Sequence, residues 1–88
     1  MSEQVTATGD VAARVIRCVV ETQHLEPARV TIDSTFAELE IDSLAGINIL
    51  FAIESEFNIT VPDEQAQTVR TVRDLVEGVE KLLAGRSA

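Results

Sequence analysis

The tripeptide Ile-Asp-Ser occurs twice within a short stretch, at residues 32–34 and again at 41–43, and each copy offers a serine hydroxyl for chemistry. Ser34 comes just before a single turn predicted inside a loop, so a role as a local cap is sufficient to explain it. Ser43 stands at the start of a long predicted helix, directly after Asp42. Because a helix takes only one N-cap residue, one of these two side chains is left without a structural task.

The charge of Asp42 favours it as the cap, because a carboxylate is stabilised at the positive end of a helix. Ser43 is then the first helical residue, and its hydroxyl points outward with no structural partner. The free N–H groups at that end would also stabilise a phosphate attached to the serine. The alternative is that Ser43 is itself the cap and Asp42 only its neighbour, and spacing alone favours this alternative.

Neither a catalytic site nor a metal site is expected. A nucleophilic serine needs a base, and the only histidine, His24, falls at the end of the first predicted helix, where a cation interacts well with the helix dipole. The single cysteine, Cys18, lies on the apolar face of that helix, and no metal-ligand cluster accompanies it. The chain is therefore not expected to be an enzyme.

The charge of the chain is strongly negative and unevenly distributed. The formal net charge is −8, and every Lys and Arg lies before residue 30 or after residue 69, so the middle of the chain carries acids and no base. Such a surface repels phosphate backbones, which argues against nucleic-acid binding, and it attracts basic protein partners.

Length and composition describe one small domain. The 88 residues are 45% apolar, with three Phe and no Trp or Tyr, so the core must be built mainly from Val, Ile, Leu and Ala, which suits a helical bundle. No apolar run approaches a membrane span, and the opening MSEQVTATGD lacks the features of a signal peptide. We therefore expect a cytoplasmic protein, and we expect it to be a monomer.

Apolar residues recur at helical spacing in four segments. These are residues 10–24 with Asp10 as N-cap, residues 43–57, a short helix that begins at Pro62, and a last helix that follows a Thr71 cap and stops at Gly85. The predicted domain covers residues 1–88, with flexible ends at 1–8 and 85–88.

A long connection separates the first two predicted helices. Pro27 breaks the helical period at its start. Within the connection, Thr35 and Glu38 have the spacing of a capping box, which predicts one helical turn over residues 36–39. Connections of this length tend to be functional or to hold local structure of their own.

One long stretch combines several of these signals in a fixed order. IDSLAGINILFAIESEFNITVPDE, residues 41–64, has Asp-Ser-Leu at the start of a helix, an apolar helix that ends in Glu-Phe, and then a Val-Pro-Asp-Glu turn. Phe36 and Leu39 upstream and TVRDLVEGV downstream fit the same order. This arrangement resembles the acyl carrier proteins, and the similarity spans nearly the whole chain. The matching residues are Asp42, Ser43, Leu44, Glu54, Glu56, Phe57, Val61, Pro62, Asp63 and Glu64.

The resemblance implies an all-α four-helix bundle with three long helices and one short helix, and a long loop between the first two helices. It also implies that 4'-phosphopantetheine is joined to Ser43 by a phosphodiester, and that the thiol of this arm holds acyl groups as thioesters. The protein would then be a carrier that presents its cargo to separate enzymes. The implied partners are a phosphopantetheinyl transferase (holo-carrier synthase), which Asp42 would assist, and acyl-transferring enzymes of the ketoacyl synthase type. Leu44 would contact partners beside the arm.

The chain departs from the usual carrier pattern just before Asp42. Leu39 is followed directly by Glu40 and Ile41, where the usual carrier has a glycine after the leucine. The path of the chain into the second helix is therefore expected to differ locally.

A second departure concerns the outer face of the second helix. A helical wheel gives it one nearly neutral face, formed by Ala45, Asn48, Ala52 and Ser55, and an opposite apolar face, formed by Ile47, Leu50, Ile53 and Phe57. The neutral face is where fatty-acid-synthesis carriers have acids. We therefore predict a specialised carrier that serves dedicated enzymes of a lipid or polyketide pathway.

The partner surface is predicted on the same helix. Ala45 and Asn48 remove charge close to the serine, whereas Glu54 and Glu56 leave some charge at the far end. Phe51 lies at the edge between the two faces, where it fits either core packing or an apolar docking point. The predicted partner-binding residues are Asp42, Leu44, Ala45, Asn48, Phe51 and Glu54.

Two other functions stay open at this point. One is a helical protein-interaction module whose Ser43 is never modified. The other is a peptidyl carrier, which loads amino acids, although its usual glycine-rich approach to the serine is missing here and Asp42 fits the acyl type.

Overall fold

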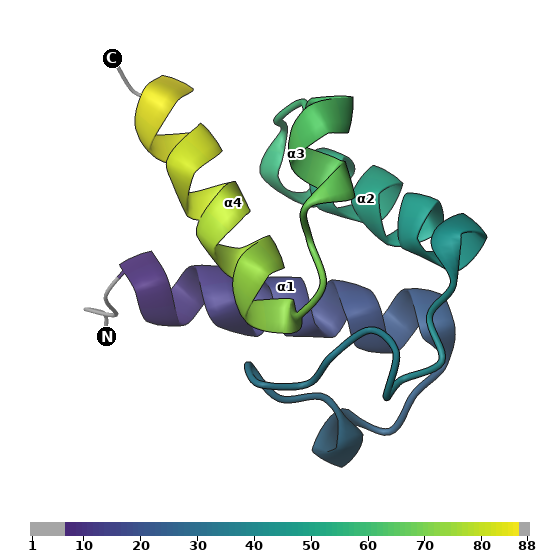
Figure 1. The fold of residues 1–88 in the computed structure, drawn as a ribbon. Helices are drawn as coiled ribbons and strands as arrows, with labels where there is room; N and C mark the ends of the chain where they lie inside the picture. Colours follow the sequence, from purple (N-terminus) through teal and green to yellow (C-terminus); the bar gives the residue numbers. More distant parts are fainter. Residues whose placement is uncertain (1–6, 87–88) are drawn as a thin grey trace.

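The computed structural model describes residues 7–86, and this part of the chain is helical with no regular strand (Figure 1). The elements are α1 (Ala7–Gln23), the 3₁₀ turn η1 (Pro27–Arg29), α2 (Ser43–Phe57), α3 (Asp63–Gln67) and α4 (Val72–Arg86). The predicted all-α fold, with three long helices, one short helix and a long loop between the first two, is confirmed.

The core is built around α1, which packs against both α2 and α4. In Figure 1, α1 runs beneath these two helices, α3 stands between them, and the long loop passes below α1. The largest fully buried side chains come from all three long helices and are Val15, Val19, Ile49, Ile53, Val72 and Val79. Cys18 lies in the same core, as predicted. Branched aliphatic side chains therefore fill the interior of a chain that has few aromatic residues.

Two helix ends differ from the prediction. α1 begins at Ala7, so Asp10 lies inside its first turn and is not the N-cap, although its charge still interacts favourably with the helix dipole. α4 continues through Gly85 to Arg86, because a glycine weakens a helix by about 1 kcal/mol relative to alanine without having to end it. The predicted flexible ends thus include helical residues, and the rest of them, 1–6 and 87–88, lies outside the described residues.

The start of α3 also differs slightly from the prediction. Pro62 occupies the N-cap position, and the helix begins one residue later, at Asp63. Asp63 and Glu64 lie in its first turn, where acids are favourable.

The predicted capping box organises the middle of the long loop. The N–H of Glu38 donates to Thr35 Oγ1 at 3.0 Å, and the N–H of Thr35 donates to Glu38 Oε1, also at 3.0 Å. Leu39 in the following turn is buried, and Phe36 packs against the core from its edge. The two apolar side chains therefore anchor the loop to the core.

The loop is also tied to the segment just before α4. The N–H of Phe36 donates to the carbonyl of Arg70 at 2.9 Å, and the N–H of Val72 donates to the carbonyl of Ser34 at 3.0 Å. An isolated antiparallel bridge lies between these two bonds. Two segments far apart in the sequence are thereby fixed side by side.

The loop enters α2 without the glycine that its geometry favours. Glu40 has a φ of 60°, in the left-handed region. The N–H of Ile41 donates to the carbonyl of Phe36 at 2.9 Å, and the N–H of Glu40 donates to that of Ala37 at 3.1 Å, which is the pattern that ends a helical turn with a left-handed residue. A residue with a Cβ is strained there by about 1–2 kcal/mol.

Glu40→Gly is expected to stabilise the fold by about 0.5–1 kcal/mol, because the relief of backbone strain exceeds the extra entropy of glycine in the unfolded chain. For a domain of this size, the midpoint of thermal unfolding should rise by about 2–8 °C. Glu40→Gln is the control, since it removes the same charge and keeps the Cβ. Equal midpoints for the two variants would show that strain at this position is not what limits stability.

Candidate functional site

Asp42 is the N-cap of α2. Its backbone is extended, with φ −87° and ψ −174°, and its Oδ1 accepts a hydrogen bond from the N–H of Ala45 at 2.8 Å. Its carbonyl accepts the N–H of Gly46, also at 2.8 Å. The capping role predicted for Asp42 is confirmed, and the alternative in which Ser43 is the cap is wrong.

Ser43 is therefore the first residue of α2, and its side chain is exposed. No hydrogen bond involves its hydroxyl within residues 7–86. The backbone N–H groups of the first turn have no intrahelical acceptor, and the positive end of the helix dipole lies at the same place. The hydroxyl is thus free for modification, at a point that stabilises an attached anion.

Ser34 differs from Ser43 in every one of these respects. It is 7% exposed, and its Oγ accepts a hydrogen bond from the N–H of Thr31 at 3.0 Å. The same Oγ donates to the carbonyl of Arg29 at 3.3 Å. The hydroxyl of Ser34 holds the loop together, so only Ser43 combines exposure with an unused hydroxyl.

A cavity of about 790 Å³ opens beside Ser43. One wall is the inner edge of α2, including Gly46 and Leu50, and the others come from the long loop, from α3 and from the segment before α4. Ser43 and Asp42 are themselves among the lining residues. A group attached to Ser43 therefore has a largely apolar space within reach.

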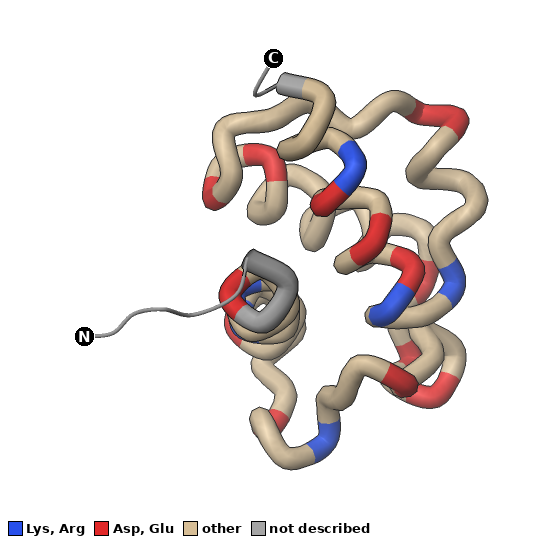
Figure 2. Tube along the Cα trace, turned by 90° about the vertical axis from the view of Figure 1, so that its left-hand side faces the viewer, with Lys and Arg blue, Asp and Glu red and all other residues tan. Residues whose placement is uncertain are grey.

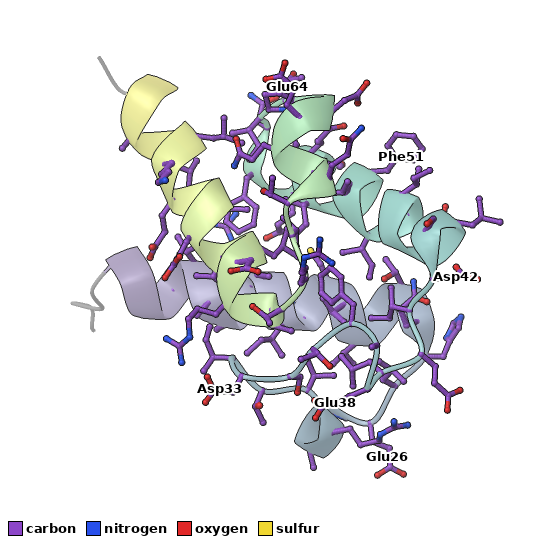
Figure 3. All side chains as sticks on the ribbon, viewed as in Figure 1. Glu26, Asp33, Glu38, Asp42, Phe51 and Glu64 are labelled. Carbon is purple, nitrogen blue, oxygen red and sulfur yellow. The ribbon has the colours of Figure 1, made fainter. Side chains whose placement is uncertain are left out.

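The outward face of α2 is not the one expected from the helical wheel. Leu44, Ile47 and Phe51 are exposed by 71%, 45% and 63%, whereas Ala45 and Ala52 are half-buried against the core. Figure 3 shows Asp42 at the start of α2 and Phe51 further along, pointing away from α1 and α4. The prediction that Ala45 and Ala52 face outward and Ile47 inward was wrong, because α2 is apolar on nearly every side and its own pattern cannot orient it.

The three exposed apolar residues Leu44, Ile47 and Phe51 form what we call the α2 stripe. They follow one another at helical spacing and start directly after Ser43. Ile47 was missed as a surface residue, and its place three residues after Leu44 was the available signal. Asn48, predicted to face outward, is exposed beside the stripe.

The acids near the end of α2 are partly exposed and are bonded to other parts of the fold. Glu54 is half-buried, and its Oε2 accepts the N–H of Val61 at 2.8 Å. Glu56 pairs with Arg14 at 2.8 Å and lies 4.0 Å from Arg17. Glu54 is therefore bonded to the following loop and Glu56 to α1, whereas the sequence pattern predicts that these acids leave charge on the outer face. In Figure 2, acidic residues, in red, occupy most of the charged positions along the trace, and basic residues, in blue, occupy the others.

The part of the chain that the structure describes gives no support for a catalytic serine, a reactive cysteine or a metal site. His24 is exposed at the end of α1, with a φ of 56°, and no hydrogen bond joins it to Ser43. Burial raises the pKa of the Cys18 thiol, which keeps it protonated in the core. Among the described residues there is no group of His, Cys, Asp and Glu that could hold a metal ion. No described helix is both long and apolar enough to cross a membrane.

Comparison with known families matches residues 13–79 to the family described as phosphopantetheine attachment site. The chain is 37% identical over 75 residues to the acyl carrier protein of Porphyromonas gingivalis, which covers 84% of this chain and 96% of that protein. It is 37% identical over 76 residues to the acyl carrier protein of Rhodococcus erythropolis, with coverage of 85% and 84%. Among solved structures, the acyl carrier protein of Thermotoga maritima matches with a TM-score of 0.81 at 26% identity, covering 96% of this chain and 99% of that one.

Removing the cap should destabilise the protein. Asp42→Ala is expected to lower the free energy of unfolding by about 1 kcal/mol, because the N–H of Ala45 loses its acceptor, whereas Asp42→Asn keeps an acceptor and should lose much less. Urea unfolding followed by circular dichroism measures both. If Asp42→Asn were as unstable as Asp42→Ala, the charge of Asp42 and not its hydrogen bond would be the stabilising feature.

Proposed function

The chain belongs to the phosphopantetheine-attachment family as an acyl carrier protein, and we propose that Ser43 is the residue that carries its covalently attached 4'-phosphopantetheine. The observation that carries this assignment is the contrast between the two serines. Ser43 has an exposed hydroxyl with no described hydrogen bond, whereas the hydroxyl of Ser34 is buried and bonded within the loop.

The residues around Ser43 fit such a group. The N-terminus of α2 stabilises the negative charge of a phosphodiester, and the exposed position leaves room for a transferase to approach. The group supplies a thiol that holds an acyl chain as a thioester. Asp42 fixes the start of the helix and so the position of the serine, and the adjacent cavity shields apolar cargo from water.

Acyl carrier proteins are carriers and not catalysts, so the chain is not an enzyme. As a member of this family it works with a phosphopantetheinyl transferase and with biosynthetic enzymes. We propose that residues 1–88 are a single carrier domain; the family match over residues 13–79 and the core around α1 support this. We also propose that the protein is a monomer and that it is located in the cytoplasm.

The finer proposal is that this carrier serves dedicated enzymes of a specialised lipid or polyketide pathway. The start of α2 supports it, because Asn48 is neutral and the α2 stripe beside it is apolar. Docking that relies on basic patches needs acids at these positions, and complementary charge mainly accelerates encounter and rejects wrong partners. The expected partner therefore presents an apolar surface to Leu44, Ile47 and Phe51.

The attachment residue is tested by modification. With a tolerant phosphopantetheinyl transferase and coenzyme A, Ser43→Ala should show no mass increase, because the only exposed serine hydroxyl of this motif is gone. Ser34→Ala should lose about 1 kcal/mol of stability with its hydrogen bonds and still be modified fully. Intact-protein mass spectrometry reads both. Modification of Ser43→Ala would overturn the assignment, and an unmodified wild type would favour an interaction module instead.

Partner choice is tested by adding charge. Asn48→Glu places an acid on the exposed face near Ser43 and should raise acyl transfer by a general ketoacyl synthase by about 1.4- to 5-fold, the equivalent of one exposed ion pair. Ser55→Glu, exposed at the far end of α2, is the matched control and should have a smaller effect. Efficient transfer from the wild type with no gain from Asn48→Glu would show that the missing charge at Asn48 does not select partners.

A further inference from the structure

Arg70 is the single basic residue that lines the cavity beside Ser43. The other charged residues of the lining are Asp42 and Asp63. Both main-chain polar groups of Arg70 are already used, since its N–H donates to Asp74 Oδ2 at 3.1 Å and its carbonyl accepts the N–H of Phe36. The backbone of Arg70 is thus fixed at the wall of the cavity by bonds that do not involve its side chain.

The guanidinium of Arg70 has no structural task within the described residues. It is exposed and forms none of the described ion pairs. Arg14 and Arg73, by contrast, are engaged with Glu56 and Asp33. The guanidinium of Arg70 is therefore available to an anion in the cavity, although Asp42 and Asp63 line the same space.

The wall of the cavity next to Ser43 also contains a glycine where the folded chain has room for a larger residue. Gly46 lies three residues after Ser43, on the same side of α2, and a Cβ added there would meet nothing within 4 Å. Glycine inside a helix weakens it by about 1 kcal/mol relative to alanine. Since no contact of the folded chain calls for glycine at this position, the open space is available to something attached at Ser43.

We propose that Arg70 binds an anionic group of the arm attached at Ser43, either the phosphodiester itself or a carboxylate on the acyl cargo. This inference rests on the proposed attachment at Ser43. The planar guanidinium matches the oxygens of both groups with paired hydrogen bonds. Asp42 and Asp63 face the same space and repel an anion, so Arg70 is the residue that makes the cavity tolerate one.

The test compares Arg70→Gln with wild type and with Arg29→Gln, which removes an exposed base that does not line the cavity. Each protein is prepared as apo, holo, butyryl-loaded and succinyl-loaded forms, and the last two carry acyl groups of equal carbon number with and without a carboxylate. Mass spectrometry confirms loading before thermal unfolding is measured. The main-chain bonds of Arg70 survive the substitution, so the apo form of Arg70→Gln should fold.

Loading should raise the midpoint of thermal unfolding of Arg70→Gln by about 1–6 °C less than it raises that of wild type. Loading should raise the midpoint of Arg29→Gln by as much as that of wild type. A loss that appears on going from apo to holo assigns the phosphodiester, and ³¹P NMR should then show a changed shift. A loss confined to the succinyl form assigns the cargo carboxylate, whose ¹³C titration should then lie at higher pH in Arg70→Gln than in wild type. Equal behaviour of the two variants in all loaded forms overturns the inference, whereas failure of the wild type to load overturns attachment itself.

Discussion

The burial of one face of α1 between α2 and α4 is the interaction on which the rest of the molecule depends. α1 packs closely against both helices, and few close contacts join α2 and α4 directly. With no Trp or Tyr in the chain, this packing relies on branched aliphatic side chains such as Val15 and Val19, and burying each contributes about 1.5–3 kcal/mol. Because α2 and α4 meet mainly through α1, a space is left between α2, α3 and the loop.

The long loop decides the shape of that space. Its hydrogen bonds to the segment before α4 bring Phe36 and Arg70 together, although the two residues lie far apart in the sequence. The loop then passes through Glu40, whose backbone is in the left-handed region, and this places Asp42 at the start of α2. The long loop thus positions Ser43, its neighbour Asp42 and part of the cavity wall. Hydrogen bonds within the loop offset the entropy cost of ordering so long a connection.

α2 contributes apolar residues both to the core and to the surface. Ile49 and Ile53 complete the core, while Leu44 and Phe51 are left on the surface. A helix with apolar residues on nearly every side is usually buried, so the apolar residues that α2 leaves exposed are a feature of interaction surfaces. The acids further along the helix are bonded within the fold, Glu54 to the N–H of Val61 and Glu56 to Arg14.

The sequence by itself determined the features that depend on local spacing. The cap at Asp42, the spare hydroxyl of Ser43 and the capping box of the loop all follow from hydrogen bonds between residues three apart, and the four helices follow from apolar periodicity and turn residues. Only the tertiary structure decided which way α2 faces, since a nearly uniform apolar helix takes its orientation from its neighbours. The same holds for Glu54, whose partner lies in the next loop, and for Arg70, whose place in the wall of the cavity that Ser43 also lines arises from contacts between segments distant in the chain.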